Sequence, residues 1–150
     1  MKRILFLFVI VNFLVSCDKS GNKSSGNIKD KKWKIDYLFC LDEMRENYTL
    51  AIQKDTSWEA NYGNFVVFSA KGVFKSYYTA PCGTDCFRTI YGIWNEISDV
   101  KFTARVDSVQ YSGWCGVSIQ DSTWMEYRNG ESIHFKILKI DGENIVLKLN

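Results

Sequence analysis

The stretch from Ile133 to Leu149, IHFKILKIDGENIVLKL, decides the fold of this chain. Apolar and polar residues alternate from Ile133 to Ile137, and apolar residues recur at every second position from Ile145 to Leu149. A period of two is the pattern of a β-strand with one buried face. Asp141-Gly142 lies between the two runs and favours a tight turn, because Gly accepts positive φ. The stretch therefore predicts an antiparallel hairpin.

The same period recurs along the chain. A phase shift between Ile137 and Leu138 predicts a β-bulge, and Ala70-Lys71-Gly72 predicts a second hairpin turn. Nine stretches are candidates for about eight short strands: residues 48–54, 64–69, 73–79, 87–94, 100–106, 109–112, 117–124, 133–140 and 145–149. Only Ile35 to Glu46 has apolar spacing that predicts a short helix.

The length and composition fit one globular domain. The chain has 150 residues, of which 46% are hydrophobic and 24% charged. No repeat of about 20–50 residues is present, which argues against a solenoid or propeller. Successive hairpins predict an all-β fold, a small antiparallel up-and-down barrel formed by residues 33–150.

The N-terminus predicts export. Lys2 and Arg3 precede an unbroken apolar run from Ile4 to Val11, which Asn12 interrupts. A membrane-spanning helix needs about 18 or more apolar residues, so we interpret residues 1–16 as a secretory signal peptide.

The leader ends in Leu14-Val15-Ser16-Cys17, which resembles the lipobox of bacterial lipoproteins. The resemblance implies that Cys17 begins the mature chain and carries acyl chains such as palmitate, which anchor it to a membrane. Asp18 to Asn27 contain no apolar residue, so residues 17–32 are expected to be the lipidated Cys and a flexible tether. We expect a place in the bacterial cell envelope, at the outer membrane rather than the inner; the periplasmic and exposed faces both stay open. The alternative is an ordinary signal peptide with a chance Cys.

Charge and residue types argue against several functions. Lys and Arg number 19 against 17 Asp and Glu, and loss of Lys2 and Arg3 with the leader makes the two equal, so no basic field attracts nucleic acid. His134 lies on the polar side of its predicted strand and has no recognisable Ser or Asp partner. No phosphate-binding loop or calcium loop is present. We therefore expect no catalysis, cofactor or metal.

Four cysteines remain after Cys17. Export to an oxidising compartment predicts two disulfides, for which three connectivities are possible. The short spacer between Cys82 and Cys86 favours a bridge between them, which leaves Cys40 with Cys115. A zinc site built from Cys82, Cys86, another Cys and His134 is the competing hypothesis.

Several short motifs resemble the lipocalin-like domains of bacterial lipoproteins. They are Trp33 near the start, the aromatic hairpin of Phe65 to Phe74, Gly92-Ile93-Trp94, and the closing run from Ile137 to Leu147. In lipocalins the Gly-x-Trp motif lies on the first strand, whereas here it is in mid-domain. The resemblance implies a small barrel whose mouth binds a small apolar ligand.

Two sets of aromatic residues carry the binding hypotheses. The first set either lines a ligand cavity or fills the core, and comprises Phe65, Phe74, Tyr78, Tyr91, Trp94 and Phe102. The second set belongs to residue types enriched in protein interfaces, and comprises Trp114, Trp124, Met125 and Tyr127. It would suit a protein-binding inhibitor or adaptor, as small lysozyme inhibitors are on similar barrels.

Overall fold

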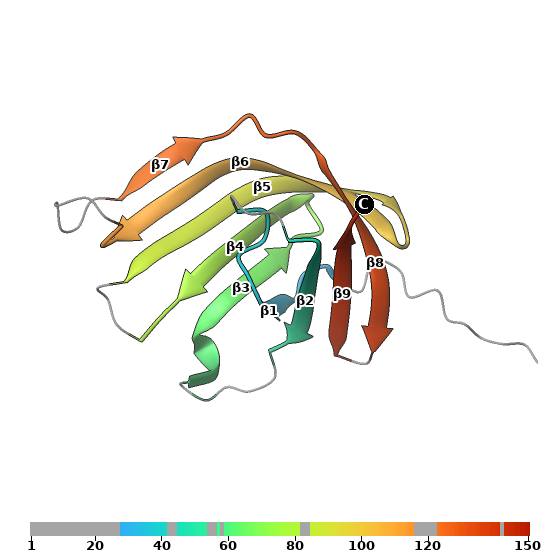
Figure 1. The fold of residues 1–150 in the computed structure, drawn as a ribbon, viewed down its shortest axis with the longest axis horizontal. Helices are drawn as coiled ribbons and strands as arrows, with labels where there is room; N and C mark the ends of the chain where they lie inside the picture. The colour runs from blue at the N-terminus through green and yellow to red at the C-terminus, as the bar shows by residue number, and fades with distance from the viewer. Residues whose placement is uncertain are drawn as a thin grey trace, which may run out of the picture.

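The computed structural model describes residues 28–41, 45–53, 57, 59–81, 85–115, 123–141 and 143–150. Nine strands make up almost all of the regular structure in these residues (Figure 1). They are β1 (Lys32–Ile35), β2 (Asn47–Ile52), β3 (Gly63–Phe68), β4 (Val73–Thr79), β5 (Cys86–Ser98), β6 (Lys101–Gly113), β7 (Trp124–Tyr127), β8 (Ile133–Asp141) and β9 (Asn144–Leu149). A short 3-10 turn, η2 (Glu59–Asn61), precedes β3.

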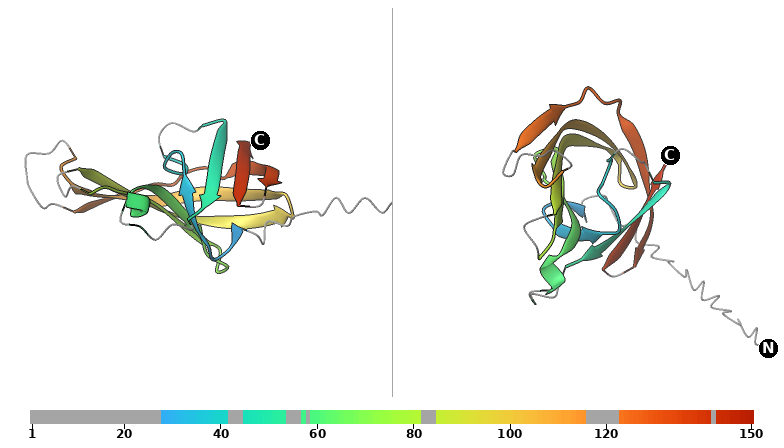
Figure 2. Two further views of the ribbon diagram at one scale, coloured as in Figure 1. Left: turned by 90° about the horizontal axis from the view of Figure 1, so that it is seen from below. Right: turned by 60° about the vertical axis from the view of Figure 1, so that its left-hand side comes forward.

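Eight of these strands close into an antiparallel barrel, which confirms the predicted fold class. Hydrogen-bonded neighbours follow the order β5-β4-β3-β1-β2-β9-β8-β6, and β6 pairs back with β5. β7 is a ninth strand outside the ring, paired with the far half of β6 (Figure 2). The order departs from a simple meander where β1 lies between β2 and β3. In the described part of the chain, no helix is long and apolar enough to cross a membrane.

The hairpin of β8 and β9 carries the predicted bulge. The register shifts between Ile137 and Lys139, so Leu138 is the extra residue, and half of its surface is exposed. The turn lies one residue later than expected, because Asp141 continues the ladder and pairs with Asn144. In the β3–β4 hairpin, Gly72 has a φ of 79°, as its turn requires.

The long strands β5 and β6 form a ribbon that extends past the barrel (Figure 1). Each has 13 residues, and the two short strands expected at residues 100–106 and 109–112 form the single strand β6. Tyr91 pairs with Ser108 and Gly92 with Val106, which leaves Asp107 as the extra residue of a bulge. β7 widens the ribbon beyond this bulge.

The helix expected over Ile35 to Glu46 was wrong for the described residues. Ile35 ends β1, the following residues form bends and a turn, and Cys40 has a φ of 59°. The reason is that the Asp36 carboxylate accepts hydrogen bonds from the backbone N–H groups of Tyr37 and Thr49, at 3.1 and 3.2 Å. Such side-chain bonds compete with helix formation. Asp42, Glu43 and Met44 lie outside the described residues.

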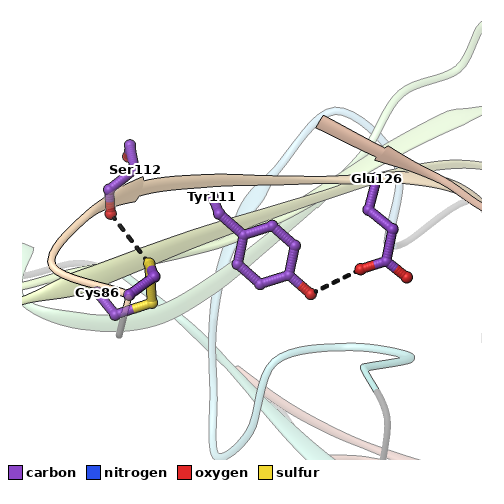
Figure 3. The surroundings of a disulfide bond; sticks show 5 residues. Cys86, Tyr111, Ser112 and Glu126 are labelled. Carbon is purple, nitrogen blue, oxygen red and sulfur yellow. Dashed lines mark hydrogen bonds between the residues drawn. A yellow bond between two sulfur atoms is a disulfide. The ribbon is translucent and has the colours of Figure 1, made fainter. Parts of the chain in front are cut away.

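The expected disulfide pairing was also wrong. Cys86 is bonded to Cys115, with a Cα–Cα distance of 4.5 Å (Figure 3). Cys40 is a buried free thiol, and Cys82 lies outside the described residues. The physical reason is strand register, since Cys86 pairs with Gly113 and Cys115 follows at the same end of the ribbon. Bonding to Cys115 also prevents Cys86 from being a thiolate ligand of zinc.

Packing begins earlier in the chain than the predicted boundary at Trp33. Ile28 is fully buried, and its carbonyl accepts a hydrogen bond from the Trp33 indole at 3.0 Å. The N–H of Asp30 donates to the carbonyl of Phe68 at 2.7 Å. Residues 28–32, assigned to the tether on composition, therefore belong to the barrel.

Candidate functional site

An aromatic side chain from the segment that follows β1 fills the interior of the barrel. Figure 2 shows the ribbon of this segment inside the ring of strands. Phe39 is fully buried. Its ring centroid lies 4.9 Å from that of Phe135 and 5.3 Å from those of Tyr48, Phe68 and Phe74. These neighbours come from β8, β2, β3 and β4, so one side chain joins opposite walls. The centre of the barrel is therefore core.

The buried hydroxyl of Ser76 holds the backbone of Phe39 in place. The backbone N–H of Phe39 donates to the Ser76 hydroxyl at 3.0 Å, and that hydroxyl donates to the carbonyl of Phe65 at 3.0 Å. Ser76 is fully buried, and both of its hydrogen bonds are made inside the protein. Sequence alternation gave no signal for this arrangement, because Phe39 belongs to no strand.

The six aromatic residues of the first predicted set do not line one cavity. Three belong to the packed core with at most 3% exposure, and Tyr78 packs against its edge. The core members are Phe74, Trp94 and Phe102. Phe65 and Tyr91 instead project away from the barrel core, because their neighbours Val66 and Ile90 occupy the core side; Phe65 is nevertheless fully buried under other side chains.

The outside of β3 to β7 carries two rows of side chains that we call the outer tyrosine face. Residues directly opposite each other on paired strands project to the same side of a sheet. One row is Val67, Lys75, Tyr91, Ser108 and Tyr127, and the next is Phe65, Tyr77, Thr89, Gln110 and Met125. Tyr91 from the first predicted set and Met125 and Tyr127 from the second therefore share one surface.

A groove of about 610 Å³ crosses the outer tyrosine face. Its walls come from four adjacent strands and include Val67, Val73, Lys75, Tyr77, Tyr91 and Asp107. The groove lies at the β5–β6 bulge, where the strands are kinked. Its volume is within the range of small-ligand sites, about 300–1,000 Å³.

Gly92 is required at this bulge. A Cβ built on Gly92 would lie 2.5 Å from the Phe74 ring and 2.2 Å from the carbonyl oxygen of Arg105. The ring of Phe74 occupies the space that a side chain at position 92 would fill, so only glycine leaves room for the ring. The Gly92-Ile93-Trp94 motif thus has a packing role in mid-sheet.

Lys75 is the cationic side chain among the residues that line the groove. Its ammonium lies 5.2 Å from the Tyr77 ring centroid and 5.7 Å from that of Tyr91. The Tyr91 hydroxyl donates to Gln110 at 3.0 Å, which fixes that ring. Burial raises the pKa of the Tyr77 phenol, so Tyr77 stays protonated at neutral pH.

The only carboxylate among the groove residues is neutralised locally. Asp107 accepts a hydrogen bond from Arg105 Nε at 3.2 Å, and Arg105 Nη2 forms an ion pair with the same carboxylate oxygen at 3.2 Å. On the neighbouring strand β1, the Lys32 ammonium lies 4.1 Å from the ring centroid of Phe65. The ring of Tyr77 also packs against Phe65, so Lys32 and Tyr77 together cover it. The outer tyrosine face therefore combines aromatic rings with an excess of positive charge.

The second predicted set divides between two surfaces. Met125 and Tyr127 are 42% and 81% exposed on the outer tyrosine face. Trp124 lies on the other side of β7, where its ring stacks on that of Tyr111 with 4.8 Å between the ring centroids. The Tyr111 hydroxyl donates to Glu126 at 3.0 Å, beside the disulfide in Figure 3. Trp114 is 55% exposed beyond the end of β6.

A second hollow, of about 510 Å³, lies at the barrel mouth. Cys40, Val106 and Leu149 line its apolar part, and Arg128 and His134 line its rim. Burial raises the pKa of the Cys40 thiol far above its usual value, so it stays protonated and unreactive. In the described residues, no group of three or more His, Cys, Asp and Glu residues could hold a metal ion.

Comparisons with protein-family models, curated proteins and solved structures found no match for this chain. The likeness to lipocalin-like domains therefore rests on the sequence motifs, with which a closed eight-stranded barrel is compatible.

Proposed function

We propose that this chain is a lipid-anchored, non-catalytic lipoprotein of the bacterial cell envelope that binds another protein through its outer tyrosine face. One observation carries the proposal. Phe39 and its ring neighbours fill the barrel interior, whereas Tyr91, Met125 and Tyr127 are presented on the outside. Tyr and Met are enriched in protein interfaces, where a few rigid aromatic side chains supply most of the binding energy.

The position of the N-terminal segment suits an anchored binder. Lys29 forms an ion pair with Glu96 near the C-terminal end of β5, while the disulfide lies at the opposite end of the same strand. Ten residues of extended strand separate Cys86 from Glu96, or roughly 30 Å. A tether leading to Cys17 would therefore leave the barrel near the Glu96 end of the ribbon. β7 lies toward the other end of the ribbon in Figure 1, and Trp114 follows Gly113, the partner of Cys86 at that end, so both would project away from the membrane.

The anchor has its own test. Replacing Cys17→Ala removes the acylated thiol, and we expect the variant to leave the membrane fraction and lose the mass of its acyl chains. The control is Cys40→Ala, which leaves the lipobox intact and should stay in the membrane. A Cys17→Ala chain that still carries lipid would overturn the anchoring proposal.

The main test is photocrosslinking in the native host, with a benzophenone amino acid placed at Tyr91 or Tyr127. The matched control is Thr49, an exposed residue of β2, which lies across the barrel from β5. We expect a discrete adduct at both tyrosine positions, identified by mass spectrometry as one protein, and none at Thr49. No adduct, or equal adducts at all three positions, would contradict the proposal.

Binding of a small apolar ligand is a second candidate, favoured by the hollow at the barrel mouth. Val106 and Leu149 offer apolar surface there, and Arg128 could pair with a polar head group at the rim. Such a ligand would lie above Phe39 rather than within the barrel.

A further inference from the structure

We propose that the outer tyrosine face recognises an acidic protein segment, and that a carboxylate of this segment binds Lys75. This inference rests on the proposed function, because it names the chemistry of the partner that binds there. The Lys75 ammonium lies near the rings of Tyr77 and Tyr91, and all three residues line the groove. In the described part of the chain, its side chain makes no ion pair.

Among the described residues that line the groove, none offers Lys75 a free carboxylate. Asp107 is the groove carboxylate, and Arg105 already binds it. Lys32 pairs with Val67 and Val67 with Lys75, so the two lysines project from strands on either side of β3. Adjacent strands are about 4.8 Å apart, which separates the two Cα atoms by roughly 10 Å. Two carboxylates of one extended segment can reach both lysines.

The groove also prepares Lys75 for binding. The aromatic rings on either side restrict the rotamers of its long side chain, so less conformational entropy is lost when a carboxylate binds. Val67 and Val73 add apolar surface, and a docked segment would exclude water from the ion pair. Screening by salt is weaker for such a partly buried pair than for a fully exposed one.

An acidic protein segment suits the groove better than a phosphate-bearing polymer. Phosphate recognition favours the bidentate fork of Arg, and Arg105 is occupied by Asp107. The apolar walls would leave a highly charged polymer partly desolvated without compensation. A segment that alternates carboxylates with apolar side chains satisfies both parts of the surface.

The test uses the full chain purified from membranes in detergent. The probe is a short fluorescein-labelled peptide built from equal parts of Glu, Val and Ser, and the matched peptide carries Gln in place of each Glu. We expect fluorescence anisotropy to show binding of the Glu peptide that weakens as sodium chloride is raised, with at least fivefold weaker binding of the Gln peptide.

Variants locate the binding. Lys75→Met keeps an unbranched apolar side chain but removes the charge, and we expect about fivefold weaker binding of the Glu peptide with an unchanged Tm. Lys75→Arg should restore most of the affinity. Lys136→Met is the control, because Lys136 is an exposed lysine on β8, outside the outer tyrosine face. It should bind the peptide as the unmodified chain does.

Several outcomes would overturn the inference. The Glu peptide could fail to bind at all, or the Gln peptide could bind with equal affinity. Lys136→Met could weaken binding of the Glu peptide as much as Lys75→Met does. Finally, inorganic polyphosphate could bind at Lys75 more tightly than the Glu peptide. The crosslinks at Tyr91 and Tyr127 are independent of the peptide result. If they form while the peptide test fails, the protein-binding proposal stands and the acidic partner is wrong; if they do not form, the proposed function fails.

Discussion

Replacing Phe39→Ala should convert a filled barrel into one with a cavity. Phe39 is fully buried, and its ring contacts residues on five different strands. Phe-to-Ala changes in cores cost about 3–5 kcal/mol, and the cost is highest where the site cannot collapse. The hydrogen-bonded ring of strands resists collapse, so we expect a loss of about 4 kcal/mol. For a domain of this size the Tm should fall by roughly 10 °C or more.

Urea unfolding followed by circular dichroism measures this loss, with Leu138→Ala as the control. Leu138 is the half-exposed residue of the β8 bulge, and its truncation should change the free energy of unfolding by less than about 0.5 kcal/mol. A dry cavity lined by aromatic rings should also bind benzene, which would raise the Tm of Phe39→Ala. A loss below about 1 kcal/mol, with no response to benzene, would refute the filled-barrel argument.

Three further predictions concern the disulfide, the bulge and the free thiol. Peptide mapping without reductant should yield Cys86 linked to Cys115, and Cys86→Ala should lower the free energy of unfolding by up to about 3.5 kcal/mol, as loop closure predicts for a separation of 29 residues; a Cys40 linkage to Cys115 would contradict the register. Gly92→Ala should cost about 1–3 kcal/mol in urea unfolding, because its Cβ overlaps the Phe74 ring, and an unchanged midpoint would show that this packing is incorrect. Cys40 should resist Ellman's reagent in the native protein and react after unfolding, whereas rapid native labelling would place it at the surface.

The strands were largely predictable because alternation and turn chemistry are local properties. The phase break at Leu138 is visible in the sequence, and it appears as a bulge at that residue. Gly72 lies at the left-handed position that its turn needs. Such signals come from the backbone of a few adjacent residues, so no tertiary information is required.

It was harder to predict from the sequence which side of the sheet each aromatic side chain projects to. Phe65 and Phe68 lie three residues apart on β3 and so project to opposite sides, but Val66 and Val67 between them make both sides apolar. Gly92 removes one inward side chain from β5, which hides the alternation that places Tyr91 outside. In both strands, pairing with neighbours decides which side is core.

Long-range packing could not be predicted from local patterns. Phe39 reaches the barrel centre through a connection without periodicity, and its position depends on the Ser76 hydroxyl of β4. The Cys86–Cys115 bond depends on the register of two long strands, whereas the short spacing of Cys82 and Cys86 suggested a local bridge. Both features arise from contacts between distant segments.

Native mass spectrometry of the full chain, released gently from membranes of its host, tests the central claim most directly. If Phe39 fills the barrel and the outer tyrosine face binds a protein, we expect two species. One has the mass of the polypeptide with its acyl chains at Cys17, and the other also contains a protein partner. A small molecule bound in one-to-one ratio, lost on Phe39→Trp but retained on Tyr91→Ala, would contradict the claim and assign binding to the barrel.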